Sequence, residues 1–457
     1  MTNDMTRGNP TRLIISFTLP VLLGNICQQL YSMVDSIIVG RAISMEALAA
    51  VGATGGVSFL VIGCIQGLTA GFSVITAQRF GAGDYEGVKR SIGISALLSV
   101  IATVVLMAAG ILTVRPLLEA MNTPADIIED SFTYIVIIYY GLIATTFYNL
   151  LSCVIRALGD SKTPLVFLVF ASLLNVALDL LFITAFHMGV GGAAWATVIS
   201  QAVSGLLCLV YALKKFSLLR LEKRHWAFDK QYAWKHLKLA LPMAMQFVIT
   251  GTSVLVNQAV LNLFGSATVA AFSAASRIHM LTEQAANSFG TAMATFTGQN
   301  YGASQIGRIR AGLRKCAVVC EGLTLAIMVP VMLFGGTMSS WFIDGYHPEV
   351  VGQAHLYLFI AALFYPVLTL LFLYRNTLLG LGNGVTPMLA GVCELLSRMI
   401  GAPVLGHFFG FTGLCWINPI AWVTATLLLF LSYCKTMRNL RPLEKGSKNS
   451  NSAEIAG

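Results

Sequence analysis

Seven ionisable side chains lie inside segments that are otherwise apolar. They are Asp35, Asp179, Arg277, Glu283, Arg375, Glu394 and Arg398, and His279 is a further candidate. An ionised group in the hydrocarbon core of a bilayer is costly, so such residues face the protein interior and commonly mark ion or substrate pathways. Two of them are carboxylates in the first half of the chain.

The polar residues of the first half can form one site. Asp35 ends a stripe on one helix face that also contains Asn25, Gln28 and Ser32. Further polar residues fall on three later segments: Tyr134, Tyr139, Asn175, Asp179, Thr197 and Gln201. Asp35, Asp179, Thr197 and Tyr139 are expected at one depth, because each lies a similar number of residues from the outer end of its segment. Such oxygens suit a hard cation such as Na⁺, or a proton on a buried acid, and polar packing between helices is the alternative.

The second half has a different polar pattern. Gln246, Thr250, Ser253 and Asn257 share one face without an acid, and Arg277 and Gln284 belong to a stripe on the next segment. Glu394 and Arg398 are four residues apart, which predicts an internal ion pair. Arg375 is predicted to extend toward the membrane surface, and His279 to be a hydrogen-bonded interior residue.

Composition indicates a membrane protein. Apolar residues make up 56% of the 457 residues and charged residues only 11%, whereas globular chains carry about 25% charged residues. The net charge of +9 is explained by basic loops on one membrane face, so we expect no nucleic-acid partner. The nine cysteines are scattered without a C-x-x-C motif, which indicates neither a metal site nor disulfides.

The apolar segments predict twelve membrane-spanning helices. Their approximate limits are 13–39, 48–77, 92–114, 131–155, 165–186, 191–213, 239–264, 269–296, 311–335, 354–377, 388–408 and 414–434. Pro330, Pro366, Pro403 and Pro419 are expected kink sites. Most Lys and Arg residues lie in the loops on the side of the two termini, which predicts that both termini are cytoplasmic.

The chain contains an internal repeat. Leu19-Pro20 returns as Leu241-Pro242, and the turn at Gly159-Asp160 returns at Gly382-Asn383, at nearly the same offset. Each half has six segments, so the halves enter the membrane in the same direction and are related by a pseudo-two-fold axis along the membrane normal. The expected fold is an all-α membrane protein with two six-helix bundles. The predicted regions are a cytoplasmic N-terminus 1–12, the bundles 13–213 and 239–434, a linker 214–238 and a tail 435–457.

Several motifs taken together resemble the multidrug and toxic compound extrusion (MATE) family over about residues 10–435. They include Leu19-Pro20, Val34-Asp35, the run from Gln66 to Asp84 and the segment Arg156-Ala157-Leu158-Gly159-Asp160, with echoes in the second half. The resemblance implies two six-helix bundles around a central cavity and cation-coupled export of organic cations and drugs.

The resemblance also implies a cation site in the first bundle. Asp35, Asn175, Asp179 and Thr197 match the family pattern, with Tyr134 as the accompanying tyrosine and Tyr139 as the alternative. These residues would bind the coupling ion, H⁺ or Na⁺, and no cofactor is expected. The chain departs from the NorM-like branch, because Thr250 and Leu368 stand where that branch has acids. A second Na⁺ site in the second bundle is therefore not expected.

We therefore expect a monomeric antiporter in the lipid bilayer that works by alternating access. The expected substrate-cavity residues are Gln28, Gln201, Gln246, Thr250, Asn257, Arg277 and Gln284. No G-x-x-x-x-G-K-[ST] motif is present, so a gradient would supply the energy. One alternative is a flippase of lipid-linked precursors, for which Arg277 and Arg398 could contact phosphates. A polytopic membrane enzyme is a further alternative, but no H-E-x-x-H motif supports it and we do not expect enzymatic activity.

Overall fold

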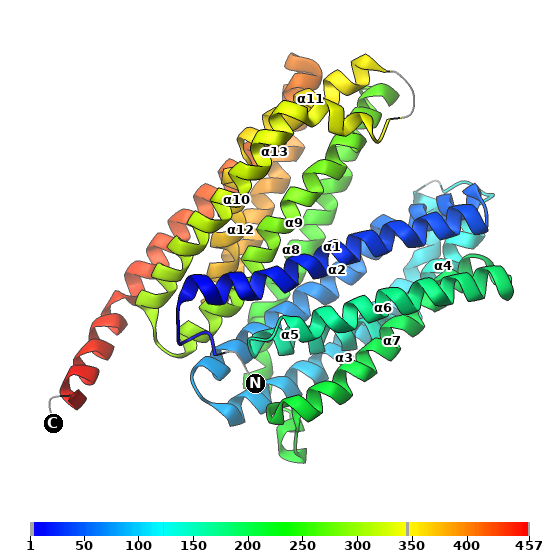
Figure 1. The fold of residues 1–457 in the computed structure, drawn as a ribbon. Coiled ribbons are helices and arrows are strands. Elements are labelled where there is room, and N and C mark those ends of the chain that lie inside the picture. The colour runs from blue at the N-terminus through cyan, green and yellow to red at the C-terminus, as the bar shows by residue number, and fades with distance from the viewer. Residues whose placement is uncertain (1–3, 122, 344–346, 456–457) are drawn as a thin grey trace. The chain divides into compact units, whose positions relative to one another are not determined.

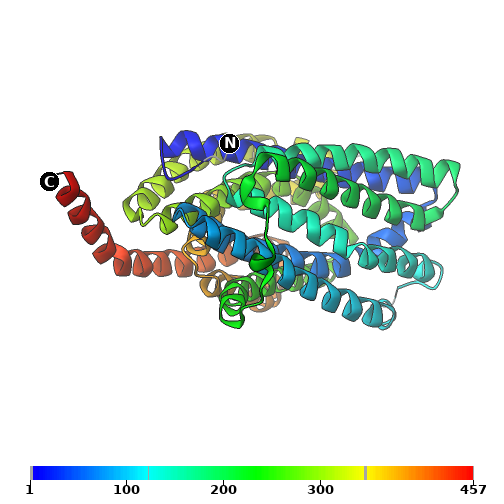
Figure 2. The same ribbon diagram turned by 90° about the horizontal axis from the view of Figure 1, so that it is seen from below.

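The computed structural model describes residues 4–121, 123–343 and 347–455, and every regular element in these ranges is a helix. This agrees with the expected all-α class. The helices of the first half are α1 (Pro10–Ala42), α2 (Met45–Gly81), α3 (Tyr85–Ala120), α4 (Ile128–Tyr140), α5 (Leu142–Ala157), α6 (Lys162–Leu180) with a π-helical turn (Leu181–Ala185), and α7 (Gly189–Lys215). α6 packs against α7, and the two lie side by side in both views (Figure 1, Figure 2).

The second half follows a connection with two short 3₁₀ helices, Ser217–Leu219 and Lys223–Trp226. Its helices are α8 (Lys230–Asn262), α9 (Ser266–Gly302), α10 (Ile306–Ser340), α11 (Pro348–Leu363), α12 (Tyr365–Gly380) and α13 (Val385–Ile455). α9 packs against α10, α11 and α12, and α12 also packs against α13. Apolar side chains of α9 to α13 form the largest cluster of this half, around Tyr357, Leu371 and Trp422.

The helices correspond to the twelve predicted spans. Eight described helices are long and apolar enough to cross a membrane, and two bent pairs raise the number to ten. α4 and α5 form one pair, bent by 48°, and α11 and α12 form the other, bent by 52°. Non-helical angles at Gly410 divide α13 into two spans. α9, which carries Arg277 and Glu283, is the remaining predicted span.

The two bends have different local causes. Pro366 is the second residue of α12, so the bend before it matches one of the predicted kink sites. The bend between α4 and α5 is at Gly141 and was not predicted. A Cβ on Gly141 would be 2.2 Å from a methyl carbon of Val198, so the glycine allows α7 to approach closely at this point.

Two equivalent turns preserve the internal repeat in atomic detail. Gly159 and Gly382 have the same φ of 87°, in the left-handed region that favours glycine. The side chain of the next residue then caps the following helix. Asp160 Oδ1 accepts a hydrogen bond from the Thr163 amide at 3.0 Å, and Asn383 Oδ1 accepts one from the Thr386 amide at 3.1 Å.

The chain divides into two compact units. The first unit consists chiefly of Leu19–Phe247, and the second of Met5–Thr18 together with the chain from Val248 onward. α1 and α8 therefore each begin in one unit and continue in the other. The predicted domain limits at 213 and 239 are the ends of predicted membrane spans, whereas the two units are defined by compactness. The predicted limits therefore stay a prediction.

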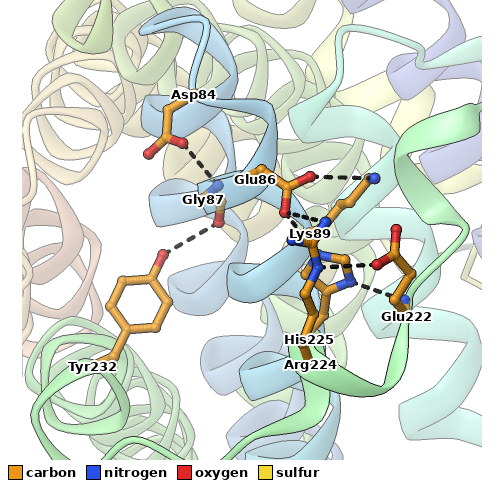
Figure 3. A network of polar contacts seen from close by, with 8 residues as sticks. All are labelled: Asp84, Glu86, Gly87, Lys89, Glu222, Arg224, His225 and Tyr232. Carbon is orange, nitrogen blue, oxygen red and sulfur yellow. Dashed lines mark hydrogen bonds and ion pairs between the residues drawn. The ribbon is translucent and has the colours of Figure 1, made fainter.

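Within the first unit, the connection that leads to α8 is fixed to the turn between α2 and α3 (Figure 3). His225 Nδ1 accepts a hydrogen bond from the Glu222 amide at 2.8 Å, so its Nε2 is the nitrogen that donates to Glu86, at 2.9 Å. Arg224 adds an ion pair with Glu86 at 3.2 Å, and the Tyr232 hydroxyl donates to the Gly87 carbonyl at 3.3 Å. These contacts set the position at which α8 begins.

The corresponding turn of the second unit, between α9 and α10, holds the segment that leads to α1. Gln299 Oε1 accepts a hydrogen bond from the Met5 amide at 2.8 Å. The Arg308 guanidinium donates to the carbonyl oxygens of Met5 and Gly8, and the Met5 side chain is only 1% exposed. The two turns of the repeat thus share a structural role, since each fixes the start of a long helix.

Candidate functional site

Two carboxyl groups meet in the interior of the first unit. Asp35 lies on α1 and Asp179 on α6, with exposed fractions of 9% and 0%. The two groups are close enough to interact electrostatically. No described donor group gives a hydrogen bond to either oxygen of Asp179 or to Oδ1 of Asp35, and the two carboxyl groups are close enough for one shared proton to join them. An unpartnered buried carboxylate is costly, so this arrangement favours a bound cation or a proton.

Amide and hydroxyl groups surround the two carboxylates. The Thr197 hydroxyl on α7 contacts Asn175 Nδ2 at 3.3 Å and the Tyr31 hydroxyl at 3.3 Å. Asn175 Oδ1 is buried and has no partner within the described part of the chain. Four oxygen atoms without a described donor are thus available, and they belong to Asp35 of α1 and to Asn175 and Asp179 of α6.

Tyr31 was not selected from the sequence, although a signal was present. It lies four residues before Asp35 and three after Gln28, and therefore on the same face of α1. Its hydroxyl contacts Thr197, and its ring lies within electrostatic range of both carboxylates. The polar stripe predicted from the sequence contains only amide side chains and smaller hydroxyl side chains besides Asp35.

The structure separates the two candidate tyrosines of the fourth span. Tyr134 lies close enough to Asp35, Tyr31 and Asp179 to interact with them electrostatically. Tyr139 instead belongs to an apolar cluster with Val114 and Ile135, and its ring lies against Gly110 of α3. Tyr134 is therefore near the carboxylates, whereas Tyr139 packs in the hydrophobic core.

The end of α6 has an irregular geometry next to this site. The helix changes to a π-helical turn, Leu181–Ala185, two residues after Asp179. Such turns are frequent at functional sites, because they alter the direction of side chains within one turn. No group of three or more His, Cys, Asp or Glu side chains suited to a metal ion occurs in the described ranges, so the candidate site has just two acids.

A polar cavity of about 200 Å³ lies in the first unit beside the site. Its walls come from α1, α2, α5, α6 and α7, and they include the predicted residues Gln28 and Gln201. Tyr31 lines the same cavity and also contacts Thr197, so it connects the cavity to the carboxylate site.

The other predicted cavity residues lie on α8 and α9. Gln246, Thr250, Asn257 and Gln284 are half-buried. Arg277 is exposed, and its guanidinium lies 5.7 Å from the ring centre of Phe342. The structure does not group these residues with Gln28 and Gln201 in the cavity of the first unit, and their role as cavity lining stays a prediction.

The second unit contains a charged network rather than a pair of acids. The predicted ion pair between Glu394 and Arg398 is present, at 3.7 Å. Arg375 also pairs with Glu394, so the prediction that Arg375 extends to the membrane surface is wrong. The reason is that Glu394 of α13 presents a second oxygen toward α12, and the Arg375 side chain is only 13% exposed.

Polar contacts extend this network. Arg398 donates to Asn418 Oδ1 at 3.0 Å and to the Ser253 hydroxyl at 2.6 Å, and Asn418 in turn donates to the Tyr357 hydroxyl. His279 is stacked between Tyr365 and Trp422, with its Nδ1 3.4 Å from the Tyr365 hydroxyl. His279 is thus an interior residue in a polar contact, as predicted.

Comparison with known proteins agrees with this arrangement of repeated helices. The sequence profile of the MatE family matches residues 20–181 and 242–404, which are equivalent parts of the two halves. The chain belongs to the MatE family. The match covers most of the chain and confirms the resemblance that the motifs indicated.

Two curated relatives and one solved structure illustrate what this MatE chain is similar to. It is 31% identical to the "probable multidrug resistance protein YpnP" of Bacillus subtilis, over 79% of this chain and 81% of the relative. It is 24% identical to a "FAD transporter" of Shewanella oneidensis, over 95% and 96%. A structure described as an outward-facing multidrug resistance MATE family transporter of the MOP superfamily has a TM-score of 0.89 and 25% identity, covering 96% of this chain and 98% of that one. This MatE protein is thus a multi-pass membrane protein of a transporter family.

Proposed function

We propose that the protein is a cation-coupled antiporter that exports organic cations and drugs by alternating access. The observation that carries this proposal is the buried pair Asp35 and Asp179, three of whose four oxygens receive no hydrogen bond from a described donor. A site of this kind can hold H⁺ or Na⁺ and release it when its surroundings change. Membership in a transporter family supports a coupling role for this site.

The proposed cycle uses the charge of the pair. A cation from outside enters and neutralises Asp35 and Asp179, while Asn175 and Thr197 supply neutral oxygen ligands or hydrogen bonds. Neutralisation removes the cost of two like charges in a buried site, which favours closer packing of α1 against α6. Because α1 lines the polar cavity through Gln28 and Tyr31, this movement changes the cavity and displaces the substrate.

The substrate class is proposed from two observations. The cavity is lined by amides, hydroxyls and tyrosines, a lining that accepts varied polar and aromatic molecules. The name of the Bacillus subtilis relative points to drugs, whereas that of the Shewanella oneidensis relative points to a flavin dinucleotide. We place organic cations first, because the name of the Bacillus subtilis relative points to drugs and the two acids beside the cavity are proposed to exchange a cation for the substrate. Among the described residues of the cavity lining, Arg156 is the charged one.

The test is efflux of ethidium from proteoliposomes with a proton or a sodium gradient imposed separately. Wild type is compared with Asp35→Asn and Asp179→Asn, which keep the side-chain shape and remove the charge. Asp130→Asn is the matched control, since Asp130 is exposed in the first turn of α4. We expect one gradient to drive efflux in wild type and control, and neither gradient to drive it in the two site variants.

Three outcomes would contradict the proposal in whole or in part. Full gradient-dependent efflux in Asp35→Asn would exclude coupling through this pair. Efflux of FAD but not of ethidium would leave the coupling intact and replace the substrate class. Transport of a lipid-linked sugar alone would favour the flippase, although Arg398, one of the two arginines that suggested it, is already engaged by Glu394, Asn418 and Ser253.

The proposal includes the membrane orientation and the oligomeric state of the protein. Both termini would be cytoplasmic in the plasma (inner) membrane, because the basic loops lie on the side of the termini. The working unit would be a monomer, since the candidate site is formed within one chain. Protease digestion of right-side-out and inverted vesicles would test the orientation.

A further inference from the structure

A basic and aromatic pocket lies in the second unit, apart from the carboxylate site. It has a volume of about 500 Å³ and is formed by the first turns of α10, the middle of α12 and a stretch within α13. An apolar cluster that includes Ile306, Leu381 and Met437 lies next to it. The lining residues that carry charge or aromatic rings are Arg310, Arg314, Tyr374, Tyr433 and Arg438.

The pocket is positively charged. Among the residues whose side chains the structure describes, three arginines and no acidic residue line it. Arg314 and Arg438 are exposed, and neither forms an ion pair with a side chain that the structure describes. Tyr433 lies within electrostatic range of Arg310 and Arg314, and its ring centre is 5.3 Å from that of Tyr374. Several guanidinium groups that line one pocket favour a phosphate, which accepts several hydrogen bonds at once.

Each of two helices continues from the pocket as an exposed apolar stripe. On α10, Val318 lies one turn beyond Arg314 and is 70% exposed. On α13, Leu431 and Leu427 lie on the same face as Arg438 and are 58% and 57% exposed. Gly322 extends the α10 stripe and leaves open space around its α-carbon.

We propose that this pocket binds the phosphate of an anionic phospholipid, with the acyl chains lying along the apolar stripes of α10 and α13. The shared chemistry is that of a phosphate ester, which a soluble phosphate could also provide. The stripes favour the lipid, because an arginine pocket that opens onto exposed aliphatic side chains matches a charged headgroup followed by hydrocarbon. Basic pockets at helix ends on the cytoplasmic side are known to bind such headgroups.

Cys434 provides a reporter in the pocket itself. It is a lining residue and is the one exposed cysteine of the nine, all of which lie within the described ranges. A lipid in the pocket should therefore slow the reaction of Cys434 with a maleimide. Cys434→Ser gives the background rate of the other thiols.

The test uses the purified full-length protein in detergent, with phosphatidylglycerol added in mixed micelles. The readouts are the rate of Cys434 labelling and the number of lipids retained in native mass spectrometry. The test variant is Arg314→Gln with Arg438→Gln, and the matched control is Lys315→Gln with Lys435→Gln. The control removes the same charge at the adjacent positions, which are exposed and do not line the pocket.

We expect phosphatidylglycerol to protect Cys434 in wild type and in the lysine control. The arginine variant should need roughly thirtyfold more lipid for the same protection, since each of the two basic residues near anionic lipid contributes about 1 kcal/mol. If the double variant does not fold, as judged by size-exclusion chromatography, each single arginine variant should still weaken protection about fivefold.

Three results would overturn the proposal. An equal loss of Cys434 protection in the lysine control would show that general surface charge attracts the lipid. Equal protection by phosphatidylcholine would show that the headgroup charge is not recognised. Equal protection by inorganic phosphate or glycerol phosphate would identify a site for a soluble anion instead.

Discussion

The carbonyl oxygen of His225 lies directly against the α-carbon of Gly93. A Cβ on Gly93 would be only 2.2 Å from this oxygen, which belongs to the backbone and cannot rotate away. The close approach lets the connection before α8 lie on α3, where Glu86 contacts His225 and Arg224. The glycine is thus required by packing and not by an unusual φ.

We predict that Gly93→Ala lowers the thermal stability of the first unit. The added methyl group would displace the connection and weaken its contacts with Glu86, at a cost of roughly 1–3 kcal/mol. Thermal denaturation in detergent would measure this. Gly52→Ala on α2 is the control, because nothing lies within 4 Å of a Cβ there and alanine should be neutral or stabilising. Equal melting temperatures for Gly93→Ala and wild type would contradict the prediction.

The carboxyl group of Asp160 should make the stability of the protein depend on pH. Burial raises the pKa of Asp160, but hydrogen bonds from Lys215 at 2.7 Å and from Thr163 outweigh this and lower it below its usual value. A carboxyl group whose pKa is lower in the folded state stabilises the protein above its unfolded pKa of about 3.9. This contribution is lost as pH falls through the folded pKa.

We therefore expect Asp160→Asn to be less stable than wild type at pH 7, by on the order of 1–3 kcal/mol. The difference should decrease below about pH 4, where the wild-type carboxyl also becomes protonated. Denaturation midpoints of both proteins measured from pH 7 to pH 3 provide the test. A difference that stays constant over this range would show that the charge of Asp160 is not the cause.

The ion pairs of Glu394 predict a large loss of stability when this residue is removed. Glu394→Ala would leave Arg375 and Arg398 without their acidic partner at a site where all three side chains are at most 14% exposed. Breaking a buried pair in this way typically costs about 3–5 kcal/mol. Adding Arg375→Met to Glu394→Ala should restore part of the stability. If the double variant is less stable than Glu394→Ala alone, the interpretation as an uncompensated charge is wrong.

Tyr31 and Tyr139 give a matched pair of substitutions at the proposed cation site. Tyr31→Phe removes the hydroxyl that contacts Thr197 at 3.3 Å, so we expect the coupling gradient needed for half-maximal efflux to rise several-fold, since one hydrogen bond contributes about 1 kcal/mol. Tyr139→Phe changes a residue of the apolar cluster and should leave this value unchanged. Efflux assays on proteoliposomes compare the two, and the reverse pattern would restore Tyr139 as the site tyrosine.

The sequence by itself determined the helices and the residues that had to be interior. Twelve apolar segments fix twelve spans because backbone groups in lipid must be bonded within a helix, whatever the neighbouring segments are. Helical spacing likewise placed Gln28 and Asp35 on one face of α1, and Asn175 and Asp179 on one face of α6, without knowledge of the packing. These properties are local to one helix, so the pattern of residues is sufficient.

Only the tertiary structure decided which of these faces meet. Tyr134 and Tyr139 lie five residues apart on α4 and therefore on different faces of it, and the packing of α4 against α3 places Tyr139 in an apolar cluster. The pattern of one helix suggested a surface position for Arg375, because its partner Glu394 lies on another helix and does not enter that pattern. The rotation of each helix about its axis depends on the side chains of its neighbours, and a single-helix pattern contains no information about them.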